Sequence, residues 1–84
     1  MKMFPTEKSI LRKLEFWMIR SYYAFTQATT ADEKKNIYNA AGFFYESLVE
    51  DYPKHQQVLT QAWENNCKPL FIKKLKEVGV EVNG

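Results

Sequence analysis

The fold of this chain is decided by residues 10–25, which read ILRKLEFWMIRSYYAF. Apolar residues return every three or four positions in this stretch, which is the period of an amphipathic α-helix. Thr6 precedes the stretch as a suitable N-cap, and Glu7 places a carboxylate in the first turn. We therefore predict a helix over residues 7–28, with a core face made of Ile10, Leu11, Leu14, Trp17, Met18, Tyr22 and Phe25.

The start and stop signals of two further helices follow directly. Thr30 and Glu33 match the capping-box pattern, in which the threonine hydroxyl accepts a hydrogen bond from the amide three residues later. Pro53 disfavours helical geometry in the residue before it, so the second helix is expected over residues 31–51. Pro53 also suits the first position of a helix, and we predict a third helix over residues 53–66.

The last part of the chain contains another proline and a late glycine. Pro69 restricts the residue before it, so we predict a break there and a short fourth helix over residues 69–78. Gly79 suits the left-handed residue that ends a helix. Two long helices, one medium and one short, joined by short loops, predict an all-α fold: a compact bundle of four helices that forms a single domain over residues 1–84.

Composition and charge exclude several classes of protein. The chain has 84 residues, of which 45% are hydrophobic, and its net charge of +2 is too small to indicate nucleic acid or membrane binding by itself. Cys67 is the single cysteine, so no intrachain disulfide is expected. No apolar run approaches the roughly 18 residues of a membrane span, and charged residues interrupt the N-terminal region where a secretory signal would lie. We expect a cytoplasmic protein that does not bind membranes.

No residue pattern in the chain predicts catalysis, a metal site or a cofactor. His55 and Cys67 are the single histidine and cysteine, and their separation matches no zinc-binding spacing. Glu46 and Glu50 share a helical face, but that face lacks the apolar surroundings that would make them an acid–base pair. A glycine-rich phosphate loop is also missing from the sequence. We therefore predict a protein that is not an enzyme and that needs neither metal nor cofactor.

The first expected helix carries a second apolar stripe, away from its core face. Phe16, Ile19 and Tyr23 follow one another at helical spacing, with basic residues beside them. Tyrosine, phenylalanine and arginine are enriched at protein interfaces. We predict that this stripe binds a protein partner and that the protein is an adaptor, inhibitor or regulator. We call this set of residues the aromatic–basic strip: Arg12, Phe16, Ile19, Arg20 and Tyr23.

Three alternatives to a protein partner at the strip stay open. A second copy of the chain would cover the strip in a homodimer. Cations beside aromatic rings also suit single-stranded nucleic acid, because the cations follow the phosphates while the rings stack on bases. The residues expected to bind nucleic acid are Arg12, Lys13, Arg20, Lys73, Lys74 and Lys76. In the third alternative, the last helix covers the strip, which then belongs to the core.

Overall fold

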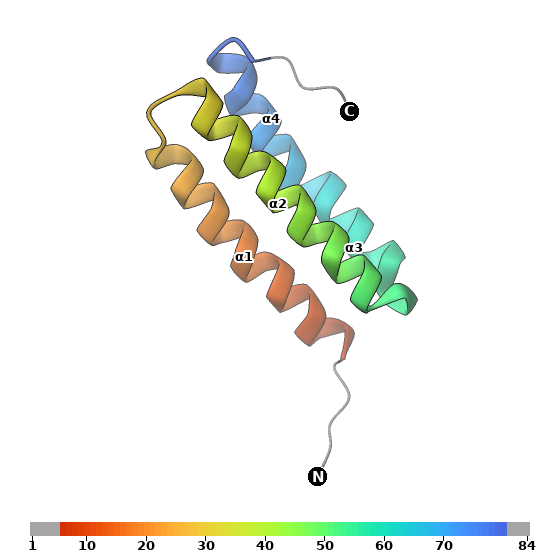
Figure 1. Ribbon diagram of the computed structural model, residues 1–84. Helices are drawn as coiled ribbons and strands as arrows, with labels where there is room; N and C mark the ends of the chain where they lie inside the picture. The colour runs from red at the N-terminus through yellow and green to blue at the C-terminus, as the bar shows by residue number, and fades with distance from the viewer. Residues whose placement is uncertain (1–5, 81–84) are drawn as a thin grey trace.

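The computed structural model describes residues 6–80, and these residues form three helical segments and no strand (Figure 1). Helix α1 spans Glu7–Gln27 and helix α2 spans Ala31–Asp51. The third segment contains helices α3, Gln56–Ala62, and α4, Lys68–Glu77. The predicted all-α class is therefore confirmed. Between Thr6 and Val80, no helix combines the length and the apolar character needed to cross a membrane.

The prediction of a break before Pro69 is wrong, and the expected helices 53–66 and 69–78 are one continuous segment. A 3-10 turn, η1 at Pro53–His55, leads into α3, and a π-helical turn, η2 at Trp63–Cys67, joins α3 to α4. Lys68 keeps helical angles, and its N–H donates to the carbonyl of Trp63, five residues earlier. The wider π turn gives the Pro69 ring room beside the preceding carbonyls, so the helix continues through the proline.

Both long helices begin at the predicted threonines. The Thr6 hydroxyl accepts a hydrogen bond from the Ser9 N–H at 3.1 Å, and the Thr30 hydroxyl accepts one from the Glu33 N–H at 3.1 Å. Each bond satisfies an amide that has no partner inside its helix. The Thr30 cap also fixes the end of the short connection between α1 and α2, because α2 starts directly after Thr30.

The end of α4 has the geometry expected from its sequence. Gly79 is left-handed, with φ 82°. The Val80 N–H donates to the Leu75 carbonyl at 2.9 Å, and the Gly79 N–H donates to the Lys76 carbonyl at 3.1 Å. This pair of bonds is a Schellman motif, so the predicted helix end is confirmed.

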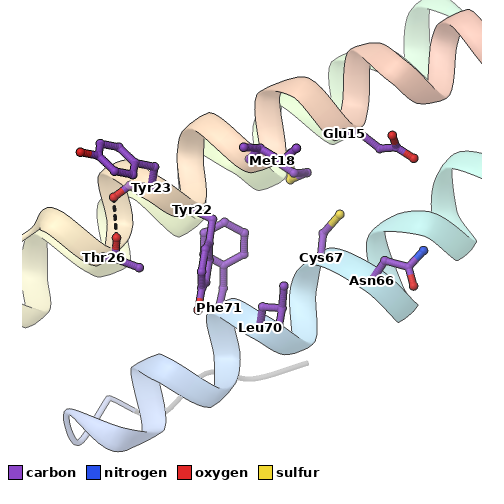
Figure 2. A pocket seen from close by; sticks show the side chains of 10 residues that line it. Glu15, Met18, Tyr22, Tyr23, Thr26, Asn66, Cys67, Leu70 and Phe71 are labelled. Atoms are coloured by element: carbon purple, nitrogen blue, oxygen red, sulfur yellow. Dashed lines mark hydrogen bonds between the residues drawn. The ribbon is translucent and has the colours of Figure 1, made fainter.

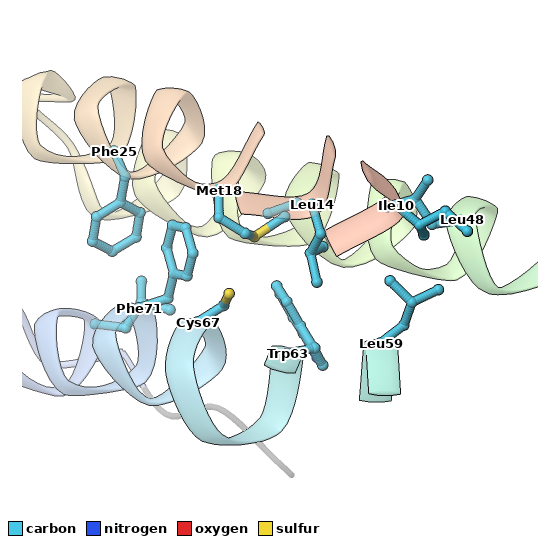
Figure 3. Close-up of a cluster of buried hydrophobic side chains, with 11 residues drawn as sticks. Ile10, Leu14, Met18, Phe25, Leu48, Leu59, Trp63, Cys67 and Phe71 are labelled. Carbon is cyan, nitrogen blue, oxygen red and sulfur yellow. The ribbon is translucent and has the colours of Figure 1, made fainter. Parts of the chain in front are cut away.

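The core lies where the three helical segments meet. α1 and α2 form an antiparallel hairpin, and the third segment returns along α2 in the same direction as α1 (Figure 1). Figure 3 shows buried side chains from α1 and from the third segment pointing toward one another. The buried apolar residues are Ile10, Leu14, Met18, Phe25, Ala41, Leu48, Leu59, Trp63, Cys67, Phe71 and Leu75.

The ring of Trp63 attaches the third segment to α2. It stacks on Tyr45, with ring centroids 5.3 Å apart, and on Tyr38, with centroids 6.1 Å apart. Gly42 lies between the two tyrosines in the sequence, and a Cβ added there would lie 3.8 Å from the Trp63 ring. The Tyr45 and Thr60 hydroxyls are also 2.7 Å apart and hydrogen-bonded. The absence of a side chain at Gly42 therefore lets the Trp63 indole lie close to the backbone of α2.

Replacing Gly42 with alanine is expected to stabilise the protein by about 0.5–1 kcal/mol, because alanine has the higher helix propensity. The added methyl would make an ordinary van der Waals contact with Trp63. Urea unfolding followed by circular dichroism measures the change, with Gly42→Val as a bulkier comparison. A loss of stability in the alanine variant would show that the indole needs more room than this geometry indicates.

One residue of the predicted core face of α1 lies at its edge instead. Trp17 is 45% exposed, whereas Leu14 and Met18 are buried. Its ring lies against Phe44 of α2, with centroids 5.1 Å apart. The apolar face of α1 is wider than the space between α2 and the third segment, so Trp17 stays partly in solvent.

Candidate functional site

The aromatic–basic strip lies on the outward face of α1. Phe16 is 55% exposed, Ile19 71% and Tyr23 68%. Arg12 and Arg20 are exposed as well. Helix α4 does not cover these residues, so within residues 6–80 the strip is surface and not core.

The middle of the strip is ordered by contacts of Phe16 and Arg20 with each other and with the neighbouring Trp17. The Arg20 guanidinium lies 5.4 Å from the centre of the Phe16 ring and 5.7 Å from that of Trp17. The two rings meet edge to face, with centroids 6.4 Å apart. Cation–π contacts of this kind contribute about 0.5–1 kcal/mol at exposed sites. These side chains are therefore partly ordered before binding, and they lose less conformational entropy on binding than side chains without such contacts would.

The arginines of the strip keep their positive charge available. Among the residues that the structure describes, no carboxylate lies within 4.0 Å of Arg12 or Arg20, while three ion pairs form elsewhere. Both side chains lie on the solvent side of α1. The strip thus combines exposed apolar area with cations that have no acidic neighbour at hydrogen-bonding distance.

A groove borders the strip on the side that faces α4. It has a volume of about 540 Å³ and lies between α1 and the η2–α4 part of the third segment (Figure 2). We call it the α1–α4 groove. Its apolar lining consists of Met18, Ile19, Tyr22, Tyr23, Cys67, Leu70 and Phe71. The polar residues Glu15, Thr26 and Asn66 complete the lining. Ile19 and Tyr23 belong to both features, so strip and groove form one continuous apolar surface.

The thiol in the groove is not an activated nucleophile. Burial of Cys67, with a smaller contribution from the charge of Glu15, raises its pKa from 9.0 to about 11. A reactive cysteine needs a lowered pKa, because the thiolate is the attacking species. Cys67 therefore acts as a neutral, polarisable part of the groove, with its sulfur directed toward α1 (Figure 2).

The raised pKa of Cys67 predicts a loss of stability in alkaline solution. The unfolded chain releases the thiol proton near pH 9.0, whereas the folded chain keeps it until about pH 11. The free energy of unfolding should therefore be insensitive to this group below that window and fall through it, by about 1 kcal/mol for each pH unit. Urea unfolding at a series of pH values measures the slope.

Cys67→Ala is the control for this measurement, because it removes the titrating thiol. Burial also raises the pKa of Tyr38, which affects both chains equally, so the difference between their slopes isolates Cys67. The same slope in both chains would contradict the assignment.

Two of the lysines predicted to bind nucleic acid have partners within the protein. Lys13 donates a hydrogen bond to the Tyr52 hydroxyl at 3.3 Å, and its ammonium lies 5.6 Å from the centre of that ring. Lys74 pairs with Glu77 at 3.8 Å. Lys13 is thereby drawn toward α2, away from the outward strip.

The remaining predicted lysines lie at a separate hollow. Lys73 and Lys76 line a shallow depression of about 440 Å³ on η2 and α4, together with Lys68, which pairs with Glu64 at 3.5 Å. No aromatic ring lines this depression. The six predicted cations therefore occur at several places and not in one patch with the rings.

The histidine and cysteine of the chain lie in different surroundings. The Nδ1 atom of His55 is 3.9 Å from the Glu7 carboxylate, at the end where α1 begins. Cys67 lies in the groove beside Met18. Within residues 6–80, no three His, Cys, Asp or Glu side chains are grouped so that they could hold a metal ion.

The groove itself is a feature that the sequence did not predict. Leu70 was expected only as an apolar residue of a short helix, yet it is 50% exposed and forms the α4 wall of the groove. Tyr22 was assigned to the core, but it is half-buried and lines the groove too. Comparison of the chain with protein-family models, with curated proteins and with solved structures gives no match.

Proposed function

We propose that this protein is a small non-enzymatic interaction protein, an adaptor, inhibitor or regulator, that binds a protein partner through the aromatic–basic strip. The observation that carries the proposal is the exposure of Phe16, Ile19 and Tyr23 along one helix face. Burying apolar surface contributes about 25 cal/mol per Å², and aromatic and arginine side chains dominate interface energetics. The single free thiol of Cys67 suits the reducing cytoplasm, where we propose that the protein acts.

The double substitution Phe16→Ala with Tyr23→Ala is expected to abolish partner capture while changing the free energy of unfolding by less than about 1 kcal/mol. Both side chains are largely exposed, so their truncation removes interface and leaves the core intact. Affinity capture from native lysate, with mass spectrometry and an assay for nucleic acid, measures binding. Thermal unfolding measures stability.

Phe43→Ala is the matched control, because Phe43 is 68% exposed but lies on α2, away from the strip. It should leave capture unchanged. Equal loss of capture in both variants would show that exposed rings bind without regard to position, and a large loss of stability in the double variant would show that the strip has a structural role.

Single-stranded nucleic acid is the second candidate ligand. The position of the Arg20 guanidinium near the rings of Phe16 and Trp17 supports it, because a cation beside rings suits phosphates and bases together. The dispersed positions of the predicted lysines support it less. Retardation of oligonucleotides that weakens steeply with added salt would favour this candidate over a protein partner.

A further inference from the structure

The α1–α4 groove has the shape of a site for one more helix. α1 and the third segment run in the same direction on the two sides of the groove (Figures 1 and 2). The lining follows α1 from Glu15 to Thr26, which corresponds to about three helical turns. A helix placed there would pack against both walls and complete a four-helix arrangement.

The lining favours a helix over an extended peptide. The lining is mostly apolar, and apart from the hydroxyls of Tyr22 and Tyr23 its polar side chains are Glu15, Thr26 and Asn66. The Thr26 hydroxyl already donates to the Tyr23 carbonyl at 2.7 Å. An extended chain would bury backbone amides with few partners, whereas a helix satisfies its own. Met18 and Cys67 in the floor adapt readily to the side chains of a bound helix.

The cations beside the groove favour a partner with acidic residues along one edge. Arg12 and Arg20 are exposed on α1 outside the groove lining, on the helix that supplies the wall of Ile19 and Tyr23, and no described carboxylate lies within 4.0 Å of either arginine. Glu15 is the one charged side chain of the lining itself, so the acidic edge of a partner belongs on the arginine side, away from Glu15. A second copy of the chain that used its own α1 would bring the same arginines face to face, and like charges opposed across an interface disfavour association. A helix with glutamates or aspartates along one edge would instead pair with them.

We propose that the α1–α4 groove binds a single amphipathic helix of another protein, with apolar residues facing the groove and acidic residues along the edge that meets Arg12 and Arg20. This inference rests on the proposed function and specifies its partner. The apolar anchors of the bound helix would recur at spacings of three or four, one on each turn.

A displayed library of helix-biased random peptides of about 15 residues tests the proposal, because that length covers the groove with almost one turn to spare. Selection on the intact protein should enrich peptides with helical apolar spacing and an excess of acidic residues. Leu70→Glu, on the α4 wall, should weaken the selected peptides by at least about tenfold, and Arg12→Glu with Arg20→Glu should do the same. Val78→Glu is the control, because Val78 is 46% exposed and lies outside the groove lining.

Two outcomes of the selection would overturn the inference: failure to select any such peptide, or selected peptides that bind Leu70→Glu as tightly as the unmodified chain. Sedimentation equilibrium showing a dimer that Leu70→Glu dissociates would also overturn it, since the occupant would then be a second copy. The proposed function and the helix-binding inference can be distinguished by their variants. If Phe16→Ala with Tyr23→Ala abolishes partner capture but Leu70→Glu does not, the strip binds a partner and the groove does not take part.

Discussion

Phe71→Ala is expected to lower the free energy of unfolding by about 3–5 kcal/mol, a large share of the stability of a domain this small. Phe71 is buried, and its ring meets rings from each of the other two helices. The centroid distances are 5.0 Å to Phe25, 5.5 Å to Tyr22 and 5.7 Å to Tyr38. Truncation would leave a cavity where the three segments converge. The rigid aromatic rings around this cavity cannot easily move in to fill it.

Urea unfolding followed by circular dichroism measures this loss. Phe43→Ala is the control here as well, because the Phe43 ring is exposed and its removal should cost no more than about 0.5 kcal/mol. Similar losses in the two variants would mean that the cluster around Phe71 is less tightly packed than the ring distances indicate.

Insertion of one alanine between Asn65 and Asn66 is expected to cost more than about 5 kcal/mol and to abolish cooperative unfolding. One added residue turns everything after it by about 100° around the helix axis. Phe71 and Leu75, both buried, would then leave the core together. Dispersion of amide NMR signals and a cooperative thermal transition are the two readouts.

The opposite change should be tolerated. Deletion of Asn66, combined with Pro69→Ala, converts the π turn into an ordinary α-helical turn and keeps the following apolar residues on the core side. We expect this shortened chain to unfold cooperatively. Its failure to fold, together with survival of the insertion variant, would contradict the structural role assigned to η2.

The sequence predicted those parts of the fold that depend on near neighbours. The caps at Thr6 and Thr30 and the left-handed Gly79 involve residues a few positions apart, and each is confirmed. The break at Pro69 was wrong, because the rule behind it describes α-helical geometry and η2 is a π turn. Tertiary packing keeps the third segment continuous where local preference favours an interruption.

A signal for the π turn was nevertheless present in the spacing of the apolar residues. The buried residues of the third segment recur at every fourth position: Leu59, Trp63, Cys67, Phe71 and Leu75. In an α-helix each step of four overshoots a full turn by about 40°, so four steps would carry the last residue about 160° from the first. A π turn rotates the chain by fewer degrees per residue, and this smaller rotation keeps all five residues on one side of the segment.

The candidate site was predictable in part. Helical spacing was enough to place Phe16, Ile19 and Tyr23 on one face of α1. Their exposure depended on where α4 lies, which is a long-range property. The groove depends on the separation of α1 and α4, so the role of Leu70 as its wall had no local signature.

The connection between the two long helices links their formation. The last turn of α1 contains no basic residue of its own. Lys34 of α2 supplies the cation: its ammonium donates to the Phe25 carbonyl at 2.8 Å and lies 5.0 Å from the centre of the Phe25 ring. Lys34, near the start of α2, neutralises the negative C-terminal end of α1. The contact that stabilises this end of α1 therefore forms only when both helices have formed. The hairpin therefore behaves as a cooperative unit, and fraying at this end of the molecule requires the two helices to open together.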